Sequence, residues 1–67
     1  MTNTAAMKGL IVSRGDTQKS LAEALQLSVS AMNAKITGKS EFRVGEIQTI
    51  IDRYGLSSAE VFHIFFR

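Results

Sequence analysis

The stretch TQKSLAEALQLSVSAMNAKITGKSEF, residues 17–42, decides the fold of this chain. It predicts two short helices, over residues 18–26 and 29–37, because Thr17 and Ser28 stand at N-cap positions and apolar residues follow each at helical spacing. Leu27 and Met32 then occupy the N′ and N4 positions of the second helix, where they can form a hydrophobic staple. About three residues separate the two helices, so the chain turns sharply between them.

Outside this stretch the sequence predicts three more helices, over residues 4–14, 44–54 and 58–66. Gly15 and Gly55 stand where C-terminal glycines end helices, and Ser57-Ser58-Ala59-Glu60 is a capping box that begins the last helix. The predicted fold class is all-α: one compact five-helix domain over residues 1–67, without strands. The residues expected to be buried are Leu10, Leu21, Leu25, Met32, Ile36, Ile47, Ile51 and Phe62.

The composition favours a folded globular domain over a disordered or membrane-spanning chain, because 45% of the 67 residues are hydrophobic and 21% are charged. The absence of cysteine excludes disulfides and thiolate metal sites. The first residues do not form a signal peptide, so we expect a cytoplasmic protein. The single histidine, His63, has no second imidazole with which to hold a metal, and no serine has a recognisable base and acid beside it. We therefore expect no enzyme activity, no cofactor and no small-molecule substrate.

Residues 17–42 resemble the helix-turn-helix of the lambda-repressor/Cro-like (XRE-type) superfamily, and the closest likeness is to small Gram-positive phage transcriptional regulators. The likeness lies in the Lys-Ile-Thr-Gly-Lys run at 35–39, in Phe42 and in Gly-Leu-Ser at 55–57, and it extends over about residues 7–66. It implies a lambda-repressor-like domain that binds a double-stranded DNA operator as a homodimer, with helix 29–37 as the recognition helix in the major groove. It also implies no catalytic activity.

The resemblance implies roles for individual residues. Bases are read from the first turns of the recognition helix, here Val29, Ser30, Asn33 and Ala34. The residues expected at phosphates are Gln18, Lys19, Ser28, Thr37, Lys39 and Arg43. Lys35 is a further candidate for a phosphate contact because it also lies beside the recognition helix. Helical periodicity places Val29, Met32 and Ile36 inward and Ser30, Ala31, Ala34 and Thr37 outward, with Asn33 and Lys35 on the flanks.

Two positions depart from the family pattern. Gln26 stands at the turn position where glycine is usual, and a left-handed conformation there costs a residue with a side chain about 1 kcal/mol. Arg43 stands at the N-cap of the fourth helix, where Ser or Thr is usual, with Glu46 three residues later. We expect a distorted turn at the first position and a phosphate contact in place of a cap at the second.

The C-terminal run VFHIFFR, residues 61–67, carries more apolar surface than one short helix can bury. Phe62, Phe65 and Phe66 are therefore expected to contact a second subunit; the alternative is that the last residues fold back over the first helix.

An alternative function also stays open at this point. The small outward side chains of helix 29–37 and the net charge of only +2 are compatible with a protein-interaction module, such as an antirepressor or an antitoxin-like adaptor.

Overall fold

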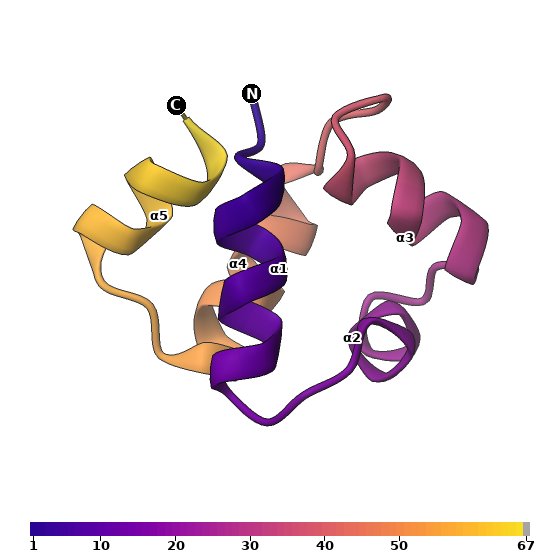
Figure 1. Ribbon diagram of the computed structural model, residues 1–67, viewed down its shortest axis with the longest axis horizontal. Coiled ribbons are helices and arrows are strands. Elements are labelled where there is room, and N and C mark those ends of the chain that lie inside the picture. The colour runs from indigo at the N-terminus through magenta and orange to yellow at the C-terminus, as the bar shows by residue number, and fades with distance from the viewer. Residues whose placement is uncertain (67) are drawn as a thin grey trace.

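The computed structural model describes residues 1–66 and confirms the predicted all-α fold. Its five helices are α1 (Thr4–Ser13), α2 (Gln18–Ala24), α3 (Val29–Ile36), α4 (Val44–Tyr54) and α5 (Ser58–Phe65) (Figure 1). Each observed helix begins where the sequence predicts it and ends at most two residues earlier. Residues 1–66 contain no strand, and none of their helices is long and apolar enough to cross a membrane.

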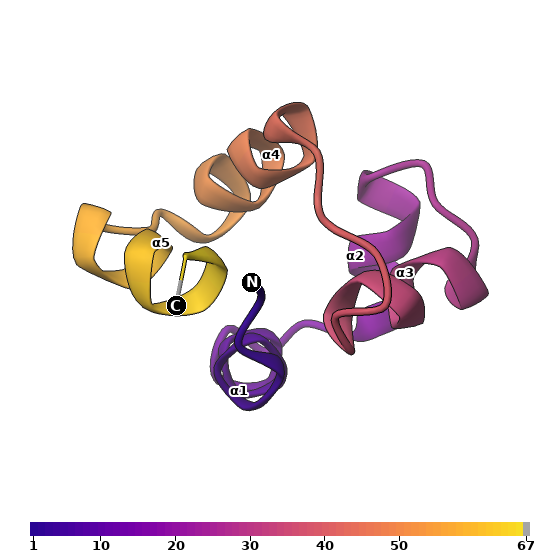
Figure 2. The same ribbon diagram turned by 90° about the horizontal axis from the view of Figure 1, so that it is seen from above.

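The helices are arranged so that α2 and α3 occupy one end of the molecule and α5 the other. Figures 1 and 2 both show α2, α3 and the loop after α3 together on the right, and α5 on the left. Helix α1 lies between the two ends and contacts both α3 and α5. The first residues strap the ends together, because the Asn3 amide donates to the Ile64 carbonyl at 2.7 Å and the Thr4 hydroxyl donates to the Ile36 carbonyl at 2.7 Å.

One continuous hydrophobic core fills the space between the helices. Its buried members are Met7, Leu10, Ile11, Leu21, Ala22, Met32, Ile36, Phe42, Ile50, Tyr54, Ile64 and Phe65. Among the predicted core residues, Leu10, Leu21, Met32 and Ile36 are confirmed as buried. Leu25, Ile47 and Ile51 are only half-buried, and of these Leu25 and Ile47 pack against the core.

The prediction for the phenylalanines of α5 was wrong in two ways. Phe62, expected in the core, is 66% exposed, whereas Phe65, expected at a subunit interface, is buried. The ring of Phe65 packs edge-on against Phe42, with the ring centroids 5.6 Å apart. Such a T-shaped pair is a favourable aromatic geometry, so Phe42 draws Phe65 rather than Phe62 into the core.

The expectation of a distorted turn between α2 and α3 was wrong, because Gln26 adopts the left-handed conformation that glycine usually takes at this position. Gln26 has a positive φ of 59°, which places it in the left-handed region. The Leu27 amide donates to the Ala22 carbonyl at 2.9 Å, which closes the turn. Ala22 is buried between the two helices, and its small side chain lets them approach closely.

The left-handed turn generates a stability prediction. Gln26→Gly removes the steric strain of about 1 kcal/mol but adds backbone freedom to the unfolded chain, so we expect a net gain of about 0.5 kcal/mol in the free energy of unfolding. Gln26→Ala is the matched control, because it keeps the Cβ atom that causes the strain and gains nothing. Urea denaturation of both variants measures the difference. Equal midpoints for the two variants would contradict a strained turn.

Candidate nucleic-acid interface

One side of α3 is open to solvent and forms what we call the exposed arc: Val29, Ser30, Asn33 and Thr37. At about 100° per residue these four side chains fall within roughly a quarter to a third of the helix circumference. The opposite side is buried and consists of Met32, Lys35 and Ile36.

The exposed arc differs from the predicted outward face. Val29, predicted to point inward, is 59% exposed, while Ala31 and Ala34, predicted outward, are half-buried. The helix is therefore rolled about its axis relative to the prediction. The roll brings Asn33 to the middle of the open side and Val29 to one edge of it.

A buried ion pair accounts for the roll. Lys35 lies on the core side of α3, and its Nζ atom lies 2.6 Å from Oε1 of Glu46 on α4. The two side chains are only 11% and 14% exposed. Lys35 is therefore not a solvated surface residue, and the phosphate contact that the sequence suggested for it does not fit its position. Burial alone would raise the pKa of Glu46, but hydrogen bonds from the Lys35 ammonium and the Arg43 amide outweigh it and hold this pKa below its ordinary value.

Hydrogen bonds within the chain already occupy two of the predicted contact residues. The Ser28 hydroxyl accepts the Ala31 amide at 3.0 Å as the N-cap of α3. The Thr37 hydroxyl donates to the Asn33 carbonyl at 2.8 Å. In contrast, the side chains of Ser30 and Asn33 make no hydrogen bond within residues 1–66. The exposed arc therefore offers three uncommitted side chains, those of Val29, Ser30 and Asn33.

Ala34, the fourth predicted base contact, is half-buried, and its backbone carbonyl holds the loop after α3. Its carbonyl oxygen accepts the amides of Lys39 at 2.9 Å and Ser40 at 3.2 Å. Gly38 makes this reversal possible with a positive φ of 84°. The loop then ends in Phe42, which is buried against Phe65, so Lys39 is presented on a well-anchored segment.

The basic residues fall into two groups. Three ion pairs join different parts of the fold: Arg14 with Glu60, Lys35 with Glu46, and Arg53 with Asp16. Within residues 1–66 the basic side chains outside these pairs are Lys8, Lys19, Lys39 and Arg43. Three of the four lie on α2 or on the loop after α3, the segments that flank α3 at its two ends (Figure 1). Gln18, at the start of α2, is half-buried.

Arg43 has the unusual N-cap role that the sequence predicts. An arginine side chain has no acceptor for a helix amide, so only half of a capping box forms. In that half the Arg43 amide donates to Oε1 of Glu46 at 2.8 Å. The exposed guanidinium is left unpaired at the start of α4.

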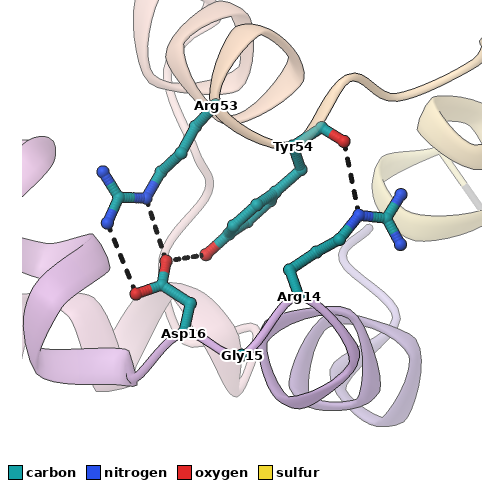
Figure 3. A pocket seen from close by; sticks show the side chains of 5 residues that line it. All are labelled: Arg14, Gly15, Asp16, Arg53 and Tyr54. Carbon is teal, nitrogen blue, oxygen red and sulfur yellow. Dashed lines mark hydrogen bonds and ion pairs between the residues drawn. The ribbon is translucent and has the colours of Figure 1, made fainter.

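A second polar cluster, which sequence reasoning missed, holds α2 in place. Figure 3 shows the Asp16 carboxylate between Arg53 and Tyr54 of α4. It lies 2.9 Å from Nε of Arg53 and accepts the Tyr54 hydroxyl at 2.5 Å. Arg53 also donates to the hydroxyl of Ser20 on α2 at 3.0 Å. Asp16 and Arg53 are 37 residues apart, and no local pattern pairs them.

This cluster shifts the ionisation of its members. The hydrogen bonds from Arg53 and Tyr54 hold the pKa of Asp16 far below its usual range. Burial, together with the bond to Asp16, raises the pKa of Tyr54 to about 12. At neutral pH the carboxylate is therefore charged and the phenol is neutral, which is the combination that lets Tyr54 donate.

The depressed pKa of Asp16 predicts an acid-dependent loss of stability. A carboxyl whose pKa is lowered on folding stabilises the fold above its unfolded value of about 3.9, and this contribution starts to be lost near that value and is lost progressively as the pH falls through the lower pKa of the folded state. Asp16→Asn should lower the free energy of unfolding at pH 7 by about 1 to 3 kcal/mol, and the deficit relative to the unmodified protein should shrink between pH 5 and pH 3. Urea denaturation across this range measures it. Asp52→Asn is the control, since exposed Asp52 accepts only from Gln48; a deficit of Asp16→Asn that stays constant with pH would refute the assignment.

Two of the three phenylalanines predicted at a subunit interface are exposed, and the third is not. Phe62 and Phe66 are 66% and 56% exposed at the α5 end of the molecule, whereas Phe65 is withdrawn into the core. Helix α5 lies at the end of the molecule opposite α3 (Figure 2).

Comparison with known proteins identifies no relative of this chain. The chain matches none of the protein-family models, curated proteins and solved structures with which it was compared. The interpretation of the candidate interface therefore depends on its own geometry and charges.

Proposed function

We propose that this protein is a sequence-specific DNA-binding transcriptional regulator, a phage-type repressor or Cro-like switch protein, that inserts α3 into the major groove of a double-stranded operator. The observation that carries the proposal is the separation of its basic residues. Those that pair with carboxylates join the helices together, while Lys19, Lys39 and Arg43 stay unpaired around α3. Unpaired cations beside an exposed helix suit duplex DNA, because they neutralise its phosphates while the helix enters a groove.

The dimensions of α3 suit this role. Its eight residues span about 12 Å, and its exposed arc carries only small or medium side chains. A major groove about 12 Å wide admits such a helix closely enough for short side chains to reach base edges. Helix α2 packs against α3 and crosses it (Figure 1). In the proposed complex α2 rests on the backbone and α3 faces the bases.

In the proposed complex, the residues that contact phosphates and the residue that contacts a base contribute differently to binding. Lys19, Lys39 and Arg43 neutralise phosphates and hold the protein on any sequence, with Gln18 at the start of α2 as a neutral phosphate contact. Asn33 has the amide that pairs bidentately with adenine, so it discriminates between sequences.

These tasks predict opposite effects of two substitutions. Lys39→Ala should weaken specific and random duplexes alike and lower the slope of log affinity against log salt by about one unit. Asn33→Ala should cost about 1 to 3 kcal/mol on the preferred site and leave binding to random duplex nearly unchanged. Fluorescence anisotropy with a duplex selected from a random pool, at several salt concentrations, measures both. Each variant is the control for the other, because both side chains are exposed and neither supports the core.

The same pair of variants tests the alternative class of function. If both leave DNA affinity untouched while binding to a protein partner is lost, α3 is a protein-binding surface and the chain is an interaction module. Absence of any duplex binding at low salt by the unmodified protein would also reject the DNA-binding proposal.

A homodimer through α5 is part of the proposal. Phe62 and Phe66 are the aromatic side chains that the core leaves exposed. Helix α5 lies at the end of the molecule opposite α3 (Figures 1 and 2), so two subunits joined through α5 keep both copies of α3 accessible. A two-fold dimer presents its recognition helices to half-sites about 34 Å apart.

The dimer predicts a specific loss of association. Phe66→Asp places a charge in the proposed interface and should shift the protein toward monomer, with weaker binding to a two-half-site duplex. Val12→Asp is the matched control, because Val12 is 75% exposed on α1, outside the α5 surface, and should leave the association unchanged. Sedimentation at micromolar concentration measures the mass. A monomeric unmodified protein, with and without DNA, would contradict the prediction.

A further inference from the structure

The exposed arc of α3 restricts the base sequence that this helix can read. Three of its side chains are uncommitted, those of Val29, Ser30 and Asn33, because the Thr37 hydroxyl already donates to the Asn33 carbonyl. No long or charged side chain stands among them. These three side chains are therefore the first candidates for direct contact with bases.

Their chemistry differs in how well it discriminates. A serine hydroxyl donates or accepts and so pairs with any base edge, which gives Ser30 no preference. The Asn33 amide matches the N6 and N7 atoms of adenine. The isopropyl group of Val29 has only one apolar counterpart in the major groove, the C5-methyl group of thymine.

Val29 is an exposed apolar residue that takes no part in the core. It is 59% exposed in the first turn of α3, outside the core cluster, although its sequence pattern predicts an inward position. Valine is also a poorer helix former than alanine at an exposed helical position. The roll fixed by Lys35 and Glu46 presents this apolar group on the same side as Asn33.

We infer that Val29 reads a thymine methyl group within about two base steps of the adenine that Asn33 reads. This inference rests on the proposed function and names its preferred substrate: a half-site with a thymine and an adenine close together. Val29 and Asn33 are four residues apart and lie on one face of α3, about 6 Å apart along its axis. Successive base pairs are about 3.4 Å apart, so the two side chains meet neighbouring or next-neighbouring pairs.

Deletion of single methyl groups from the DNA tests the inference directly. A duplex is first selected from a random pool with the unmodified protein, and each thymine of its half-site is then replaced in turn by deoxyuridine, which lacks only the C5-methyl group. We expect one replacement to weaken binding about fourfold, which corresponds to ~0.8 kcal/mol for one buried methyl-sized group. Val29→Ala should bind the thymine and deoxyuridine duplexes equally well. Val12→Ala, at an exposed valine on α1, should keep the fourfold preference.

The outcomes separate this inference from the proposed function. If the protein selects a duplex but no deoxyuridine replacement weakens binding, the inference is wrong and the DNA-binding proposal stands. The same holds if Val29→Ala keeps the preference for the methyl group. If no duplex is selected at all, the proposed function fails and the inference fails with it. Circular dichroism of the variants verifies that each is folded, as the exposure of both valines leads us to expect.

Discussion

The ion pair between Lys35 and Glu46 determines which side of α3 meets the solvent. Its Nζ–Oε1 distance of 2.6 Å, in a setting where both side chains are almost covered, restricts α3 to one rotation about its axis. A buried pair of this kind gains little net stability over well-packed apolar residues, because both charges lose their water. Here the pair fixes the orientation of α3 about its own axis. An apolar side chain at position 35 packs equally well over a range of rotations, whereas the ammonium must reach one oxygen atom.

The other basic residues differ in whether they form an ion pair within the chain. Arg14, Lys35 and Arg53 each pair with a carboxylate of the same chain, so their charges are balanced within the molecule. The unpaired cations are concentrated on α2 and on the loop after α3, but exposed Glu23 and Glu41 lie on the same two segments, so the net charge there is +1 (three cations and two carboxylates), no higher than the +2 of the whole chain. Local distribution, rather than the total, governs attraction to a phosphate backbone.

Local signals in the sequence predicted most of the fold, and long-range pairings account for what they missed. The caps at Thr17, Ser28 and Ser57 are formed by side-chain oxygens that accept amides three residues later, so they are visible in the sequence alone. Lys35 misled the prediction of the roll, because a lysine in a helical pattern indicates an outward face unless its partner is known. On α5, Val61 with Ile64 and Phe65 forms an apolar stripe, but so does Phe62 with Phe65 and Phe66. Periodicity could not choose between these stripes, and Phe65 belongs to both; the burial of Ile64 and the exposure of Phe62 and Phe66 show that the first stripe faces the core.

Helix α4 emerges as the element that positions both helices of the proposed interface. Glu46 in its first turn holds α3 through Lys35, and Arg53 in its last turn holds α2 through Asp16 and Ser20. These two residues are seven apart, so they lie on one face of α4 about 10 Å from each other. With seven residues, α2 is too short to be stable or oriented without such contacts. The relative placement of α2 and α3 thus depends on the turn at Gln26 and on the fixed spacing of two charges on α4. A residue inserted between Glu46 and Arg53 would rotate one charge by about 100° and separate the two helices from their common support.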